Sequence, residues 1–69
     1  MPLSLAEANV ELTIKRITGN DKIRQHLQSI GFIEGEPIMV INTINENVIV
    51  KLRGISMALT HDMAKRIYV

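Results

Sequence analysis

The 69-residue chain contains no cysteine, no tryptophan and only two aromatic residues, Phe32 and Tyr68. Without cysteine it can form neither a disulfide nor a thiolate metal site, and it has no cysteine nucleophile. The lack of cysteine fits a reducing compartment, and we expect a cytoplasmic protein. Nucleic-acid grooves usually stack bases on aromatic rings, so the shortage of aromatics argues against that function.

Excess charge of one sign and long apolar runs are missing as well. Eight Lys/Arg against seven Asp/Glu give a net charge of +1, which leaves no strong field for nucleic acid or an anionic membrane. The longest apolar run is Ile38–Ile41, far short of the ~20 residues of a membrane span. Residues 1–7 also lack the basic and apolar regions of a signal peptide. We therefore expect a protein with no nucleic-acid partner and no membrane insertion.

The length predicts a single domain over residues 1–69. Surface scaling predicts that ~4,400 Å² remains exposed after folding. A core this small leaves little room for a buried active site, and most of the 46% apolar residues are needed to build it. Phe32, Met57 and Met63 are interpreted as core residues.

No catalytic constellation is present. Ser4, Ser29 and Ser56 lack the surroundings of an activated nucleophile, and the four glycines are dispersed rather than gathered in a phosphate-binding loop. His26 and His61 are the only histidines, whereas a transition-metal site needs three or four ligands. We predict a protein that is not an enzyme, has no cofactor and carries both histidines on its surface, with weak metal binding as the alternative.

The first residues predict a short helical turn followed by a strand. Ser4 and Glu7 have the spacing of a capping box, with Leu3 and Ala8 placed as its hydrophobic staple. Apolar and polar residues then alternate over residues 10–15, which is typical of a half-buried strand.

A helix is predicted from about Asp21 to Ile30, and the preceding segment Gly19-Asn20-Asp21 supplies its N-cap candidates. The apolar residues Ile23, Leu27 and Ile30 fall on one stripe of that helix. Gly31 follows at the position where a helix commonly ends in the left-handed region.

Residues 38–44 and 48–54 predict a hairpin of two β-branched strands. With a three-residue loop over residues 45–47, Asn47 takes the left-handed position, and Ile44 pairs with Val48 and Val40 with Leu52. One face then carries Ile38, Val40, Ile44, Val48, Val50 and Leu52.

The last residues predict a strand around residues 57–59, a helical turn capped by Thr60, and a short strand over residues 67–69. The fold class is therefore mostly β: a small, partly open barrel of about five strands with one helix after the first strand.

The second face of the hairpin is the candidate functional site. It carries three large apolar side chains beside two cations, which together form a plausible contact surface: Met39, Ile41, Ile49, Lys51 and Arg53. The alternative is that the hairpin bends sharply and that the N-terminal segment half covers this face. Apolar residues on both faces are also compatible with a homo-oligomer.

Three segments carry a resemblance to a known family. The helix-to-turn segment Ile23–Gly35, the segment Arg53–Leu59 with the ending Ile67–Val69, and the opening Leu3–Ala8 resemble, in order and over the whole chain, the FeoA family (ferrous iron transport protein A). The resemblance implies an SH3-like barrel in the cytosol that assists ferrous iron uptake through FeoB, a membrane GTPase transporter. It implies neither an enzyme nor a transferable set of metal ligands.

Three positions depart from the family pattern. His26 and Thr60 stand where basic residues are common, and Asn9 stands at a usual glycine position. Asparagine tolerates a left-handed turn, so we expect the fold to be retained.

Four hypotheses follow from the sequence. The first is an interaction module that docks on the cytosolic part of a FeoB-type transporter. The second is a regulatory module like the C-terminal domain of DtxR-type repressors, whose barrel is similar. The third is a small nucleic-acid-binding barrel, and the fourth is a protein that binds ferrous iron directly through its histidines.

Overall fold

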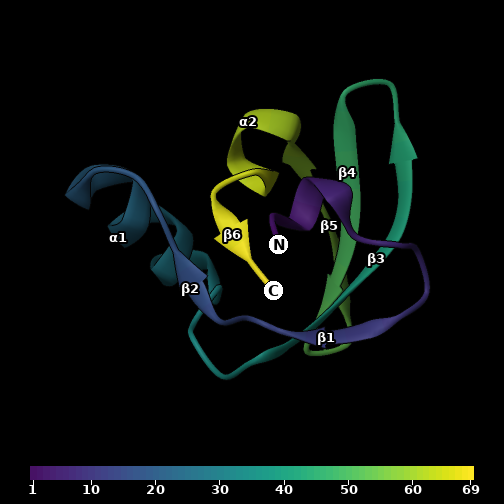
Figure 1. Ribbon diagram of the computed structural model, residues 1–69, viewed down its shortest axis with the longest axis horizontal. Helices are drawn as coiled ribbons and strands as arrows, with labels where there is room; N and C mark the ends of the chain where they lie inside the picture. Colours follow the sequence, from purple (N-terminus) through teal and green to yellow (C-terminus); the bar gives the residue numbers. More distant parts are fainter.

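The computed structural model describes residues 1–69 and consists of two small sheets, two α-helices and one 3₁₀ turn (Figure 1). In chain order the elements are η1 (Leu3–Leu5), β1 (Glu11–Thr13), β2 (Arg16–Ile17), α1 (Asp21–Ile30), β3 (Pro37–Ile44), β4 (Asn47–Leu52), β5 (Ile55–Thr60), α2 (His61–Ala64) and β6 (Ile67–Tyr68). One sheet has the order β1-β3-β4-β5 and the other pairs β2 with β6. The solvent-accessible surface is 4363 Å², close to the value that the chain length predicts.

The predicted first strand is divided between the two sheets. Glu11–Thr13 pairs with β3, whereas Arg16–Ile17 pairs with β6. The buried Ile14 lies between them, and its N–H and C=O bond to the backbone at Glu36 and Gly35. Alternation predicted the burial of Ile14 correctly, but Val10 is 41% exposed because it precedes the paired residues. The helix therefore follows the second of two short strands, and the strands number six rather than about five.

Helix α1 begins and ends where its sequence predicts. The Asn20 side chain accepts a hydrogen bond from the Ile23 N–H at 2.9 Å, and Gly31 ends the helix with a φ of 124°. Leu27 is fully buried, but Ile30 is 42% exposed, so the predicted apolar stripe is correct only for its first two turns.

The 3₁₀ turn η1 forms without the predicted capping box. Its N-cap residue is Pro2, and no side chain caps it. Leu3 is 1% exposed, and its burial fixes the turn. Ala8 is exposed and forms a bridge to Val40, so the predicted staple between Leu3 and Ala8 is wrong.

The predicted β3–β4 register is wrong, although the buried face is largely right. The loop has two residues, Ile44 pairs with Asn47 rather than Val48, and the left-handed residue is Asn45 with a φ of 57°. An irregularity at Ile41 then shifts the pairing so that Val40 faces Val50. As a result Ile44 is 53% exposed instead of buried.

The core lies between the four-stranded sheet, α1 and the C-terminal segment. Phe32, Leu27, Val50, Ala64 and Ile67 are fully buried there. Met57 and Met63 pack against this core as predicted. Thr60 caps α2 by accepting a hydrogen bond from the Met63 N–H, and the two chain ends lie side by side, with the Val69 N–H bonded to the Met1 C=O (Figure 1).

Candidate functional site

The five residues of the candidate site come from the β3–β4 hairpin and the turn that follows it. Met39 and Ile41 lie in β3, Ile49 and Lys51 in β4, and Arg53 in the turn to β5. The three apolar side chains are half-buried, whereas Lys51 and Arg53 are exposed. We call this set the outer face. The N-terminal segment runs beside β3 in edge pairing, with Glu11 opposite Met39.

Cross-strand pairing arranges the outer face in rows. One row crosses all four strands of the sheet, in the order Glu11, Met39, Lys51 and Ser56. Side chains of directly opposed residues point to the same side of a sheet. Met39 therefore lies between an acid and a base, and the rim of this face carries both signs of charge rather than cations alone. Sequence reasoning missed Glu11 because only the β1–β3 pairing brings it to the site.

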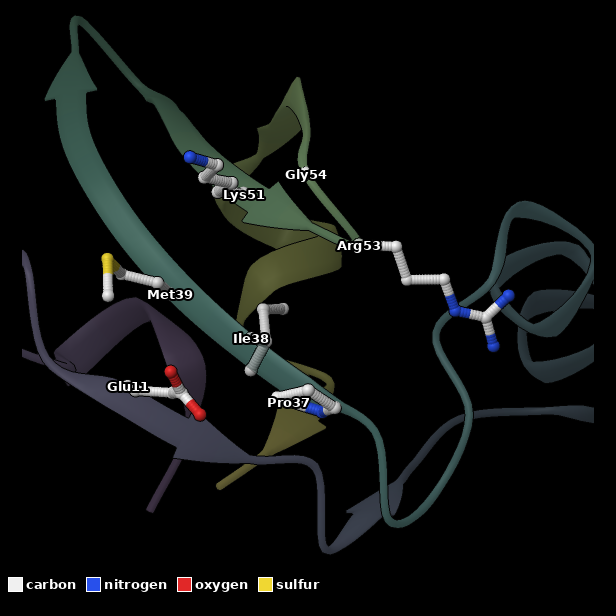
Figure 2. Close-up of a pocket in the computed structure, with 7 residues that line it drawn as sticks. All are labelled: Glu11, Pro37, Ile38, Met39, Lys51, Arg53 and Gly54. Atoms are coloured by element: carbon white, nitrogen blue, oxygen red, sulfur yellow. The ribbon is translucent and has the colours of Figure 1, made fainter.

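Part of this row lines an open hollow of about 300 Å³ (Figure 2). Its lining includes three of the five predicted site residues, Met39, Lys51 and Arg53, together with Glu11. Ile41 and Ile49 do not line it. The structure thus separates the predicted set into residues around the hollow and two aliphatic residues further along the hairpin.

Arg53 is held away from the rest of the set. Its guanidinium donates to the Glu36 carboxylate at 2.8 Å, and Figure 2 shows its side chain extending away from Met39 and Lys51. The hydrogen bond and the charge of Glu36 raise the pKa of Arg53 above its usual range. Lys51 takes part in no ion pair, so it is the unpaired cation of the outer face.

The turn that carries Arg53 has an unusual backbone for its residue types. Leu52 pairs with Ile55 across a two-residue loop, and both loop residues have positive φ, 53° at Arg53 and 79° at Gly54. Such a turn normally takes asparagine, aspartate or glycine at its first position. An arginine there is strained because its Cβ is crowded in the left-handed region.

A second hollow, of about 510 Å³, lies between the β3–β4 loop and the start of α2. It is lined only by polar residues, among them Glu46, His61 and Asp62. Lys65 donates to Asp62 and lowers the pKa of that carboxyl below its usual value, so this acid is already paired. No group of three or more His, Asp or Glu side chains comes together anywhere in the chain to hold a metal ion.

The remaining candidates are dispersed. His26 lies exposed on α1, whereas His61 is the first residue of α2. Arg16 stacks over the Tyr68 ring at 4.7 Å, and Lys65 and Arg66 face Asp62. No helix is long and apolar enough to cross a membrane.

A model of the FeoA domain matches residues 1–69, which is the whole chain. The chain belongs to the FeoA family. No curated protein sequence matches it.

Solved structures agree with the family and the fold. An iron uptake regulatory protein (FeoA) is 27% identical, with a TM-score of 0.86 over 96% of this chain and 88% of that one. FeoA of Stenotrophomonas maltophilia, solved with zinc and described as a prokaryotic SH3 domain protein, is 25% identical, with a TM-score of 0.86 over 100% of this chain and 88% of that one. A manganese-dependent transcriptional repressor shares the fold, with a TM-score of 0.87 and 18% identity over 100% of this chain and 40% of that one. The protein is therefore an SH3-like FeoA domain.

Two of the three departures from the expected pattern have a structural explanation. Asn9 adopts a φ of 65°, the left-handed conformation that a glycine would supply. Thr60 caps α2. His26 is exposed on α1, and its C=O accepts a hydrogen bond from the Ser29 hydroxyl.

Proposed function

We propose that this FeoA domain is an accessory protein of ferrous iron uptake that acts in the cytoplasm by contact with a FeoB-type membrane GTPase transporter. The family membership supports a role in iron transport. One relative, the Stenotrophomonas maltophilia protein, is described as a suggested activating factor of ferrous iron transport. The half-buried apolar side chains of the outer face support surface contact as the means of action.

The row through Met39 carries this proposal. A flexible, half-buried thioether flanked by a carboxylate and an unpaired ammonium is suited to a partner surface, because methionine adapts to irregular contacts. The charges of Glu11 and Lys51 select a partner that presents a base opposite the first and an acid opposite the second. Ile49, in the next row of β4, enlarges the apolar part of the contact.

Glu36 has a supporting role in this proposal. It holds the Arg53 guanidinium away from Met39 and Lys51 (Figure 2). A partner carboxylate can bind that guanidinium only by competing with Glu36, so we expect Arg53 to contribute less to binding than Lys51.

The proposal is tested by measuring binding to the isolated cytosolic part of the transporter. The double variant Met39→Asp/Ile49→Asp places two acids on the outer face, and we expect at least a ~30-fold loss of affinity, the loss typical of one interface hot spot. The control variant Leu5→Asp/Ile33→Asp makes the same chemical change at two exposed apolar residues, which are 71% and 43% exposed, and it retains the wild-type affinity.

Circular dichroism checks that both variants are folded. If the wild-type protein fails to bind the transporter, docking is wrong. If it binds and both double variants bind equally well, docking stands but the outer face is not the surface used.

A further inference from the structure

Strand β5 is an open edge of the four-stranded sheet. It pairs with β4 on one side and with no strand on the other. None of its residues takes part in the backbone hydrogen bonds that lie outside the regular elements. Ser56, Ala58 and Thr60 are all exposed. The far edge of β5 therefore has no backbone hydrogen-bond partner in the chain.

One hydrogen bond shows which backbone groups of β5 point outward. The His61 N–H donates to the Glu46 C=O at 2.9 Å, and this bond flanks the opposed residues Asn47 and Thr60. Antiparallel strands alternate between hydrogen-bonded and non-hydrogen-bonded pairs. Leu59, Met57 and Ile55 consequently bond to β4, and the N–H and C=O groups of Ser56 and Ala58 point to the open edge with the Thr60 N–H.

This edge lacks the features that normally prevent strand pairing. Residues 55–60, Ile-Ser-Met-Ala-Leu-Thr, contain no charge and no proline, and their pairing with β4 is regular throughout. The opposite edge of the same sheet is protected, since β1 has only three residues and begins with Glu11. The β1 edge is therefore protected against pairing with another strand, whereas the β5 edge is available for it.

We infer that β5 pairs with β5 of a second copy of this chain, antiparallel and about a two-fold axis at Ala58. Each Ala58 N–H then donates to the Ala58 C=O of the other copy, and each Thr60 N–H donates to the other copy's Ser56 C=O. The Thr60 C=O takes no part because Thr60 is the N-cap of α2.

The β5 side chains of one copy are compatible with the β5 side chains that they meet in the second copy. Ser56 faces Thr60 of the second copy, and hydroxyl pairs of this kind are favourable cross-strand neighbours. Ala58 faces its own copy with only a methyl group, which allows close approach. No charged side chain of β5 opposes its own symmetry mate, so the self-pairing meets no repulsion from this strand.

Pairing about this axis brings the two outer faces together. The sheet becomes continuous through β5 of both copies, and side chains that share a face in one copy continue on the same side in the other. Lys51 lies opposite Ser56 in the same row. A dimer therefore presents two copies of the Met39 row on one face, which suits a partner with two binding sites.

Sedimentation velocity over a concentration series tests the proposal. The series runs from about 10 µM to about 1 mM, because one strand edge buries far less than a standard interface and the dimer is therefore weak. We expect the apparent mass to rise toward twice the monomer value. Ala58→Lys puts a charge at the axis and abolishes that rise. Ala58→Pro also abolishes it, because proline removes the central N–H without changing the net charge of the protein. Thr13→Lys, the same charge added at the exposed end of β1, leaves the rise unchanged.

Amide hydrogen exchange followed by NMR gives a second measure that needs no variant. Concentrating the wild-type protein slows exchange at Ala58 and Thr60, while Ser56 keeps its monomer rate. A protein that stays monomeric throughout, a dimer that persists in both Ala58 variants, or a dimer without slowed exchange at Ala58 and Thr60 overturns the proposal. Protection of these amides only after addition of another protein also overturns it, because the edge then accepts a foreign strand.

Discussion

The inner and outer faces of the β3–β4 hairpin are both built from large aliphatic side chains, but only the inner face is sealed. Ile38, Val40, Val48, Val50 and Leu52 are each at most 3% exposed. Met39, Ile41 and Ile49 on the other face are only half-buried, and no helix or sheet covers the hollow beside Met39. Apolar residues on the inner face stabilise the fold, whereas those on the outer face are available for contact.

The difference arises from what packs on each side. Helix α1 ends directly over the inner face, since a Cβ at Gly31 would lie 3.3 Å from the Leu52 side chain. Beside the outer face, β1 and residues 8–9 pair with the edge of β3. The same alternation of residues along a strand therefore supplies both a core face and a contact face. The packing of the rest of the fold determines which face is buried.

The largest expected effect is on the inner face. Leu52→Ala removes a side chain that is 2% exposed beneath the end of α1, and we expect a loss of about 2–5 kcal/mol in the free energy of unfolding. Lys51→Ala, at the neighbouring exposed position, is the matched control and changes stability little. Urea denaturation measures both. A loss below that range for Leu52→Ala would mean that the core collapses around the cavity.

The alternation that distinguishes the faces could be predicted from the sequence, whereas the register could not. Val40 faces inward whether it pairs with Leu52, as predicted, or with Val50, as found, because a shift of two residues leaves the faces unchanged. The two-residue loop accounts for one residue of this shift and the irregularity at Ile41 for the other. Asn45 and Asn47 were equally suited to the left-handed position, so the loop length had no clear signal. The irregularity at Ile41, which leaves Ile44 exposed, has no local sequence signal.

The candidate site was predictable only in part for a related reason. Met39, Ile49 and Lys51 share a face within one hairpin, and a local pattern can show that. Glu11 and Glu36 reach the site from β1 and from the loop before β3. Helix α1, by contrast, was predicted at both ends because Asn20 and Gly31 act on their own neighbours in sequence.

A smaller effect on stability is expected on the outer face. Ile49→Ala removes methyl groups from a half-buried site whose neighbours can relax toward solvent, and we expect a loss of about 1 kcal/mol. Val50→Ala is the comparison, because Val50 is the adjacent residue on the inner face and is 0% exposed. We expect it to lower the free energy of unfolding more than Ile49→Ala does, although its side chain loses fewer atoms. Equal losses for the two variants, measured by urea denaturation, would show that the outer face is as sealed as the inner one.

The smallest expected effect is a gain in stability at Arg53, where the turn is strained. Arg53→Asn keeps the positive φ of 53° but places there a residue that tolerates it, at the first position of a two-residue hairpin loop. We expect the melting temperature to rise by a few degrees, even though the exposed ion pair with Glu36 is lost, because such pairs contribute little.

Arg53→Ala separates these two causes. It also removes the ion pair, but its Cβ remains crowded in the left-handed region, so it should bring no comparable rise. If both variants melt at or below the wild-type temperature, the ion pair stabilises the turn by more than the strain at Arg53 costs, and the predicted gain in stability is wrong. If asparagine alone stabilises the protein, the positive φ of Arg53 costs stability in the wild-type turn, and the ion pair with Glu36 does not offset that strain.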